Sequence, residues 1–225
     1  MTEPAWKNPG ISLAARCVLF LRAEMRAGVK ADPYPQPNTS PRVAEYLAPC
    51  VRDLDGDGDE DQMPLTVGNW CAAIQCFALR ECLLPSETAP HKYRAGVVEL
   101  ISDAKLNGLW HPVKEVRSGE WTPSHGDLVI WDRSDPLKPE TSWWRHVNRL
   151  THFNPISQRL TTIGGNESRK IMLTDKAPKG LDHSGLIGFI SYRPTDNVRP
   201  YTDDDRANDL ALIAAFVETH RRAVA

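Results

Sequence analysis

The chain has 225 residues, enough for one domain with a sizeable core, and its 18 prolines against 14 glycines indicate long loops. Its formal net charge of -2 lacks the basic excess typical of nucleic-acid-binding proteins, so nucleic acid is not an expected partner. The N-terminus lacks the features of a secretory signal, and the apolar run at residues 11–21 is too short and too charged to span a bilayer. We therefore expect synthesis in a cytoplasm and no membrane insertion.

Apolar residues at helical spacing, with recognisable start and stop residues, predict helices in the first half of the chain. The expected helices cover residues 10–28, 41–47, 69–84 and 93–107. The pattern then changes to that of strands, at residues 127–131, 146–153, 160–163 and 186–192. Helices followed by strands predict one α+β domain over residues 1–198. Residues 199–225 are expected to form a capped amphipathic helix that packs on this domain.

The cysteines are candidates for catalysis rather than for disulfides. There are five of them, and an odd number in a protein made in a cytoplasm argues against a disulfide framework. Cys71 stands at the start of a predicted helix, where unpaired backbone amides stabilise a thiolate. Cys76 and Cys82 fall within the apolar body of the same helix, so we expect them in the core. The alternative for Cys71 is a buried, unreactive thiol.

A catalytic cysteine needs a nearby imidazole and a group that orients it. His146 begins a predicted strand, and Asn166 follows two glycines after the next one. An amide oxygen at Asn166 would accept the imidazole N–H and fix its tautomer. His125 and His152 are rival histidines, and His152 shares a strand face with His146 if the strand alternates regularly. Asn166 has an alternative role as a turn residue.

Four segments in order resemble the CHAP and NlpC-type family of cysteine peptidoglycan hydrolases. They are residues 38–46 (NTSPRVAEY), 69–73 (NWCAA), 126–131 (GDLVIW) and 146–147 (HV) followed by 162–166 (TIGGN). The resemblance covers residues 10–192 and is carried by the order of the motifs rather than by any one of them. It implies a papain-like fold, with the N-terminal helices followed by a small antiparallel sheet.

The resemblance also implies that Cys71, His146 and Asn166 hydrolyse an amide bond in the peptidoglycan stem peptide. Both an amidase and an endopeptidase fit the motifs. Two positions depart from the family pattern: Arg145 replaces a glycine common before the histidine, and Gly164 replaces a glutamate common in CHAP members. Glu167 is close by but does not match the position of that glutamate. The alternatives are a calcium-stabilised cell-wall or partner-binding module with a degenerate active site, and a papain-like acyltransferase.

An acidic loop precedes the predicted nucleophile. Carboxylates alternate along residues 53–61 (DLDGDGDED), with a glycine at loop position six, as at the start of a calcium-binding loop. We expect calcium here as the cofactor, while the alternative is a solvated acidic turn. The twelfth position is proline rather than the glutamate of an EF-hand. The expected ligands are Asp53, Asp55, Asp57, Asp59 and Asp61.

The expected partner is bacterial peptidoglycan, and the expected state is a monomer. Without a signal peptide, the protein would reach the periplasm or the outside of a cell after phage lysis, as an endolysin, or through a specialised secretion machine. If it is a secreted effector, an immunity protein is a further expected partner.

Overall fold

The fold is that of a computed structural model, which describes residues 4–33, 39–52, 61–62, 70–135, 137–138, 144–176 and 178–192. These residues form a mixed helical and antiparallel-sheet structure with a helix-rich N-terminal part, so the α+β prediction is confirmed. The expected helix at 199–225 lies outside the described residues, as does the acidic loop except for the backbone of Asp61. Nothing therefore tests the proposed boundary at residue 198.

Within the described residues, the four helices predicted in the first half of the chain are present, together with two short ones that the sequence pattern did not reveal. The helices are η1 (Ala5–Lys7), α1 (Leu13–Arg26), α2 (Pro41–Leu47), α3 (Cys71–Cys82), α4 (Val97–Leu106) and α5 (Val113–Ser118). Ser12 and Ser40 cap α1 and α2, because their side chains accept hydrogen bonds from backbone amides three residues later. η1 and α5, with three and six residues, are too short to show a helical period.

The strands form one large sheet and one small hairpin. They are β1 (Val51–Arg52), β2 (Asp61–Gln62), β3 (Trp110–Pro112), β4 (Leu128–Asp132), β5 (Arg145–Asn154), β6 (Arg159–Glu167), β7 (Lys170–Leu173), β8 (Lys179–Gly180) and β9 (Leu186–Ile190). β1 pairs with β2, and the large sheet has the order β3-β9-β4-β5-β6-β7, with β8 also paired to β6. All these pairs are antiparallel. The four predicted strands are confirmed, and β6 extends beyond its predicted end to Glu167.

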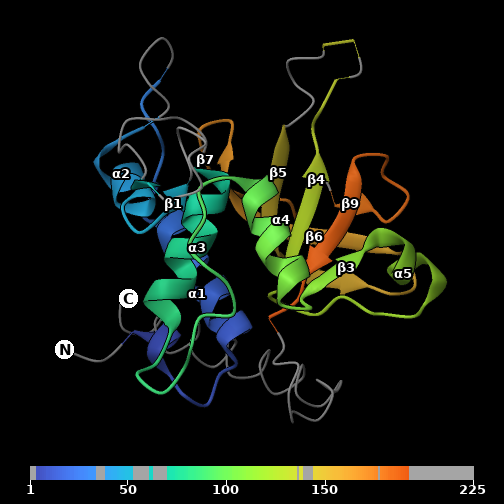
Figure 1. Ribbon diagram of the computed structural model, residues 1–225, viewed down its shortest axis with the longest axis horizontal. Coiled ribbons are helices and arrows are strands. Elements are labelled where there is room, and N and C mark those ends of the chain that lie inside the picture. The colour runs from blue at the N-terminus through green and yellow to red at the C-terminus, as the bar shows by residue number, and fades with distance from the viewer. Residues whose placement is uncertain are drawn as a thin grey trace.

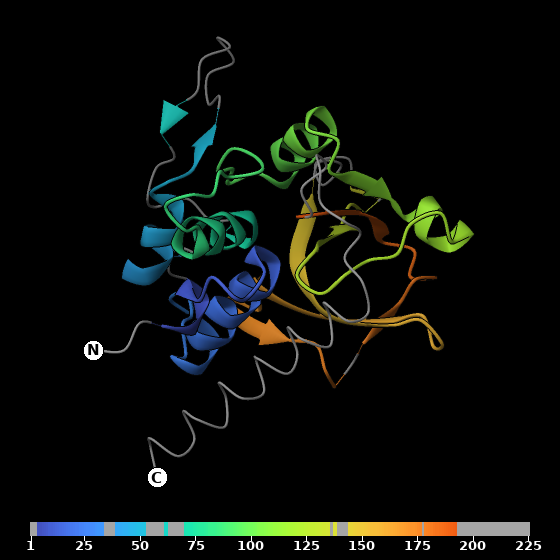
Figure 2. The same cartoon turned by 90° about the horizontal axis from the view of Figure 1, so that it is seen from below.

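The sheet separates two apolar cores. Helices α1 and α3 stand beside one side of the sheet, and α5 lies at its far end beyond β3 and β9 (Figures 1 and 2). Alternate residues of β4 divide between the cores: Leu128 and Ile130 join the helices, whereas Val129 and Trp131 pack with Val116 of α5. Ten of the twelve residues of α3 are buried, including its first residue, Cys71.

None of the helices in the described parts of the chain is long and apolar enough to cross a membrane.

Candidate active site

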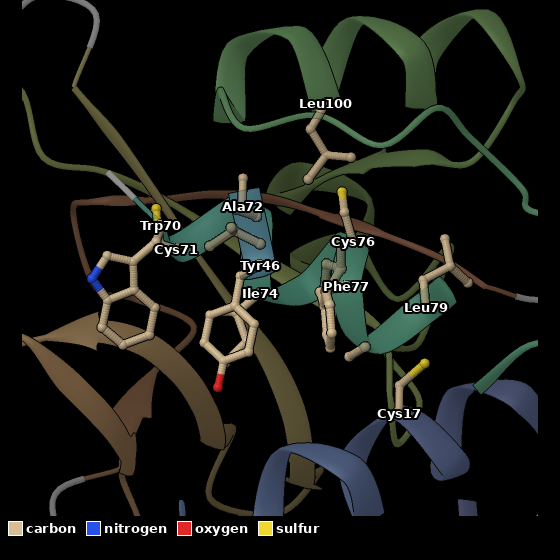
Figure 3. Close-up of a cluster of buried hydrophobic side chains, with 14 of the residues drawn as sticks. Cys17, Tyr46, Trp70, Cys71, Ala72, Ile74, Cys76, Phe77, Leu79 and Leu100 are labelled. Atoms are coloured by element: carbon tan, nitrogen blue, oxygen red, sulfur yellow. The ribbon is translucent and has the colours of Figure 1, made fainter. Parts of the chain in front are cut away.

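Cys71 is the first residue of α3 and is 4% exposed. Its neighbour Trp70 immediately precedes the helix and is fully buried, with its ring centroid 6.0 Å from that of Tyr46. Figure 3 shows both rings on one side of the helix start and the Cys71 sulfur directed away from them. The first backbone amides of the helix have no acceptor within it and give the site a partial positive charge. The fold thus places the thiol where a thiolate is stabilised.

Cys76 and Cys82 are both fully buried in the core around α3, as the sequence predicted. Cys76 lies in the middle of the helix, where its sulfur accepts a hydrogen bond from the Arg94 amide at 3.2 Å. Their positions leave Cys71 as the cysteine of α3 that meets the first strand residues of β5.

His146 is the second residue of β5 and is 2% exposed. Its imidazole lies close to the Cys71 thiol and lowers the pKa of that group, as does the backbone amide of Val147. Nε2 of His146 lies 2.7 Å from Oε1 of Glu167. This contact is close enough for an ion pair, but the N–H is not directed well at the oxygen, so it is not a well-aligned hydrogen bond. With Nε2 next to Glu167, we infer that Nδ1 faces the thiol.

Glu167 therefore occupies the place next to the imidazole for which the sequence analysis chose Asn166. A register irregularity in β6 between Gly164 and Glu167 explains the difference. Within it, Asn166 has a φ of 59°, a left-handed backbone that asparagine tolerates better than most residues. A bulge of this kind interrupts the alternation of the strand and redirects the side chains that follow. As a result, Glu167 lies on the same face as Asn148 and His146.

The protonation states follow from these contacts. Burial alone would raise the pKa of the Cys71 thiol, but His146, the Val147 amide and the charge of Arg133 hold it below its usual value. Burial would lower the pKa of His146, whereas Cys71 and Glu167 raise it to about 9. The pKa of Glu167 would rise on burial but is held well below its usual range by His146, Asn148 and Arg133. The directions of these shifts favour a thiolate–imidazolium pair, next to an ionised Glu167, over a neutral thiol and imidazole.

Two side chains that the sequence analysis did not single out hold Glu167 in place. Nδ2 of Asn148 donates to Oε1 of Glu167 at 3.0 Å and to the Thr162 hydroxyl at 3.3 Å. Nη2 of Arg133 lies 3.1 and 3.0 Å from the two carboxylate oxygens. Asn148 is a polar residue in an otherwise buried strand, two positions after His146 and so on the same face. That pattern was the available signal in the sequence.

The two glycines before Asn166 are required by close packing. A Cβ at Gly164 would lie 2.0 Å from Oδ1 of Asn148, and a Cβ at Gly165 would lie 2.3 Å from the Trp70 ring. One glycine therefore makes room for the residue that holds Glu167. The other makes room for the tryptophan that immediately precedes α3.

The rival histidines lie elsewhere. A register shift in β5 between Leu150 and His152 breaks the regular alternation. Leu150 and Phe153, three positions apart, consequently pack in the same core, and His152 is exposed on the other face. The expectation that His152 shares a face with His146 is thus wrong. His125 is buried before β4, and the amide of the next residue, Gly126, donates to the carbonyl of Leu150 at 2.8 Å, four residues along β5 from His146.

The expected calcium ligands cannot be placed. Asp53, Asp55, Asp57 and Asp59 lie outside the described residues, and only the backbone of Asp61 is described, in β2. Among the residues whose side chains are described, no group of three or more His, Cys, Asp or Glu residues is arranged to hold a metal ion. The calcium site stays a prediction.

No family model, curated protein or solved structure matches this chain. Its function must therefore be argued from the geometry of the site.

Proposed function

We propose that this protein is a papain-like cysteine hydrolase that cleaves an amide bond in the peptidoglycan stem peptide. The observation that carries the proposal is the chain of contacts from Cys71 through His146 to Glu167, in which the imidazole is 2% exposed and Nε2 lies 2.7 Å from the carboxylate. A nucleophile, a base and an orienting group in contact are the requirements for thiol catalysis. The choice of peptidoglycan rests on the motif order of the sequence.

In the first half of the reaction, the Cys71 thiolate attacks the amide carbonyl carbon. The negative charge on the carbonyl oxygen is stabilised by backbone amides at the start of α3, including that of Cys71 itself. The His146 imidazolium then protonates the leaving nitrogen, the C–N bond breaks and an acyl-thioester forms.

In the second half, neutral His146 removes a proton from water, and the resulting hydroxide attacks the thioester. The C–S bond breaks, the acid product leaves and the thiolate–imidazolium pair is restored. Glu167 stays ionised throughout and stabilises the imidazolium in both halves. In this proposal Glu167, rather than Asn166, is the third member of the triad, with Asn148 and Arg133 positioning it.

The direct test is digestion of purified cell-wall sacculi, followed by mass spectrometry of the released fragments. The wild-type protein should release fragments with one new amine and one new carboxylate, whereas Cys71→Ala and His146→Ala should release almost none. Matched controls are Cys82→Ala, at the far end of the same helix, and His152→Ala, on the other face of the same strand. Both controls should retain activity.

Other results would count against the proposal. Wall binding without fragment release would favour a binding module with an inactive site. Transfer of an acyl group to an added amine, with no hydrolysis in its absence, would favour an acyltransferase.

A further inference from the structure

Two cations lie on the strand face that carries His146. Trp131 of β4 is paired directly opposite His146 of β5, so their side chains share one face of the sheet. Nζ of Lys179, on β8, lies 4.4 Å from the centroid of the Trp131 ring. A lysine ammonium therefore lies over the cross-strand neighbour of the proposed base.

Arg133 is the second cation and follows Trp131 by two residues. Its side chain is 40% exposed, and one nitrogen, Nη2, contacts both oxygens of Glu167. Among the residues that the structure describes, Nε and Nη1 have no acceptor, and Lys179 forms no ion pair. Burial lowers the pKa of Lys179, Glu167 raises it and Arg133 lowers it further, so these three groups interact. Two positive charges thus face one carboxylate.

We propose that Arg133 and Lys179 form a subsite for a carboxylate of the substrate, next to the bond that is cleaved. A guanidinium with free N–H groups binds a carboxylate with two parallel hydrogen bonds, and a lysine adds a charge-assisted one. The excess positive charge would be neutralised by one further anionic group. This proposal rests on the proposed function for its substrate class, an acyl-peptide with a free carboxylate beside the scissile amide.

The test measures binding separately from cleavage. The probe is a synthetic stem peptide with a free carboxylate beside the scissile amide, compared with the same peptide in which that group is amidated. Binding is measured by calorimetry to the full-length Cys71→Ala protein, which cannot cleave either peptide under the proposed mechanism. We expect the amidated peptide to bind roughly tenfold more weakly, as for the loss of one charge-assisted contact.

Substitutions of Lys179 test whether this residue causes the preference for the peptide with the free carboxylate. Lys179→Met in the Cys71→Ala background should reduce the affinity ratio toward one, whereas Lys179→Arg should keep it. Lys105→Met is the matched control, because Lys105 lies 5.7 Å from the Trp110 ring, away from the site, and should leave the ratio unchanged. Equal affinities for the two peptides, or no binding of either, would overturn the subsite. A preserved ratio without cleavage by the wild-type protein would instead overturn the proposed function.

Discussion

The carboxylate of Glu167 accepts a hydrogen bond from Nδ2 of Asn148 at 3.0 Å across the β5–β6 pair. This contact and the 2.7 Å approach to Nε2 of His146 support the proposed orienting role of Glu167. Glu167→Gln preserves the shape of the side chain and removes its charge. We expect kcat for fragment release to fall roughly 10²- to 10⁴-fold, because the imidazolium loses its stabilising partner. Steady-state kinetics on a defined wall fragment would measure the loss.

The informative control is Asn166→Gly, which keeps the left-handed backbone at that position without the side chain. Asn166→Gly should reduce kcat for fragment release much less than Glu167→Gln does. If the two variants are equally inactive while both remain folded, the orienting role returns to Asn166.

The pH dependence of the site provides a second prediction. The pKa of Cys71 is held below its usual value and that of His146 is raised to about 9, so the thiolate–imidazolium pair exists between these two values. Alkylation of Cys71 by iodoacetamide should therefore begin well below pH 9. The value of kcat/KM should fall as the pH rises through about 9, because His146 loses the proton that the leaving nitrogen needs.

Glu167→Gln should move this fall in kcat/KM to lower pH, since Glu167 raises the pKa of His146. Cys82→Ala should not move it. If kcat/KM of Glu167→Gln still falls near pH 9, the carboxylate does not stabilise the imidazolium.

Local signals in the sequence predicted the regular parts of the fold. Ser40 followed by Pro41 fixed the start of α2, because a serine cap and a proline in the first turn are both local preferences. The position of Cys71 at the start of α3 and of His146 at the start of β5 followed from the same kind of reasoning. The structure brings these two residues into contact.

The two points at which the arrangement of the site differs from the sequence-based expectations both come from strand irregularities. The alternation of side chains along a strand holds only while its pairing is regular. The register shift in β5 moves His152 to the other face from His146, and the one in β6 moves Glu167 to the face of Asn148. Such shifts depend on pairing between distant segments, so they are not visible in the local residue pattern. Glu167 was therefore noted in the sequence but not assigned a role.

A third prediction concerns Gly164, which leaves space for Asn148. A Cβ there would lie 2.0 Å from Oδ1 of Asn148, so Gly164→Ala should force that side chain away from Glu167. We expect the free energy of unfolding to fall by about 1–3 kcal/mol, as for other overpacked positions. Activity should fall as well, because Glu167 loses a hydrogen bond. Urea unfolding and fragment release would measure the two effects.

The control for Gly164→Ala is the double variant Gly164→Ala/Asn148→Ala, which removes the side chain that the new methyl group meets. It should be more stable than the sum of the two single changes predicts, while activity stays low. Strictly additive losses of stability would mean that Gly164 and Asn148 do not interact.

The last prediction is that the acidic loop at residues 53–61 binds calcium and stabilises the fold. β1 and β2 pair Arg52 with Asp61, so the two ends of the loop lie side by side. Its closely spaced carboxylates repel one another without a cation. Calcium at a hundredfold excess over its Kd would add about 2.7 kcal/mol to the free energy of unfolding. Melting curves with EDTA, and then with calcium restored, should show a reversible rise in Tm.

The acidic stretch ends ten residues before Cys71 in the sequence, so calcium binding there should also raise the rate of fragment release. Magnesium should substitute poorly, because it requires a stricter octahedral arrangement of ligands than calcium does. An Asp55→Asn/Asp57→Asn variant should lose the calcium response, whereas Asp175→Asn, at an exposed aspartate outside the loop, should keep it. If neither Tm nor the lytic rate responds to calcium, and calorimetry detects no calcium uptake, the loop is a solvated acidic turn and the helix start at Cys71 is organised without a metal.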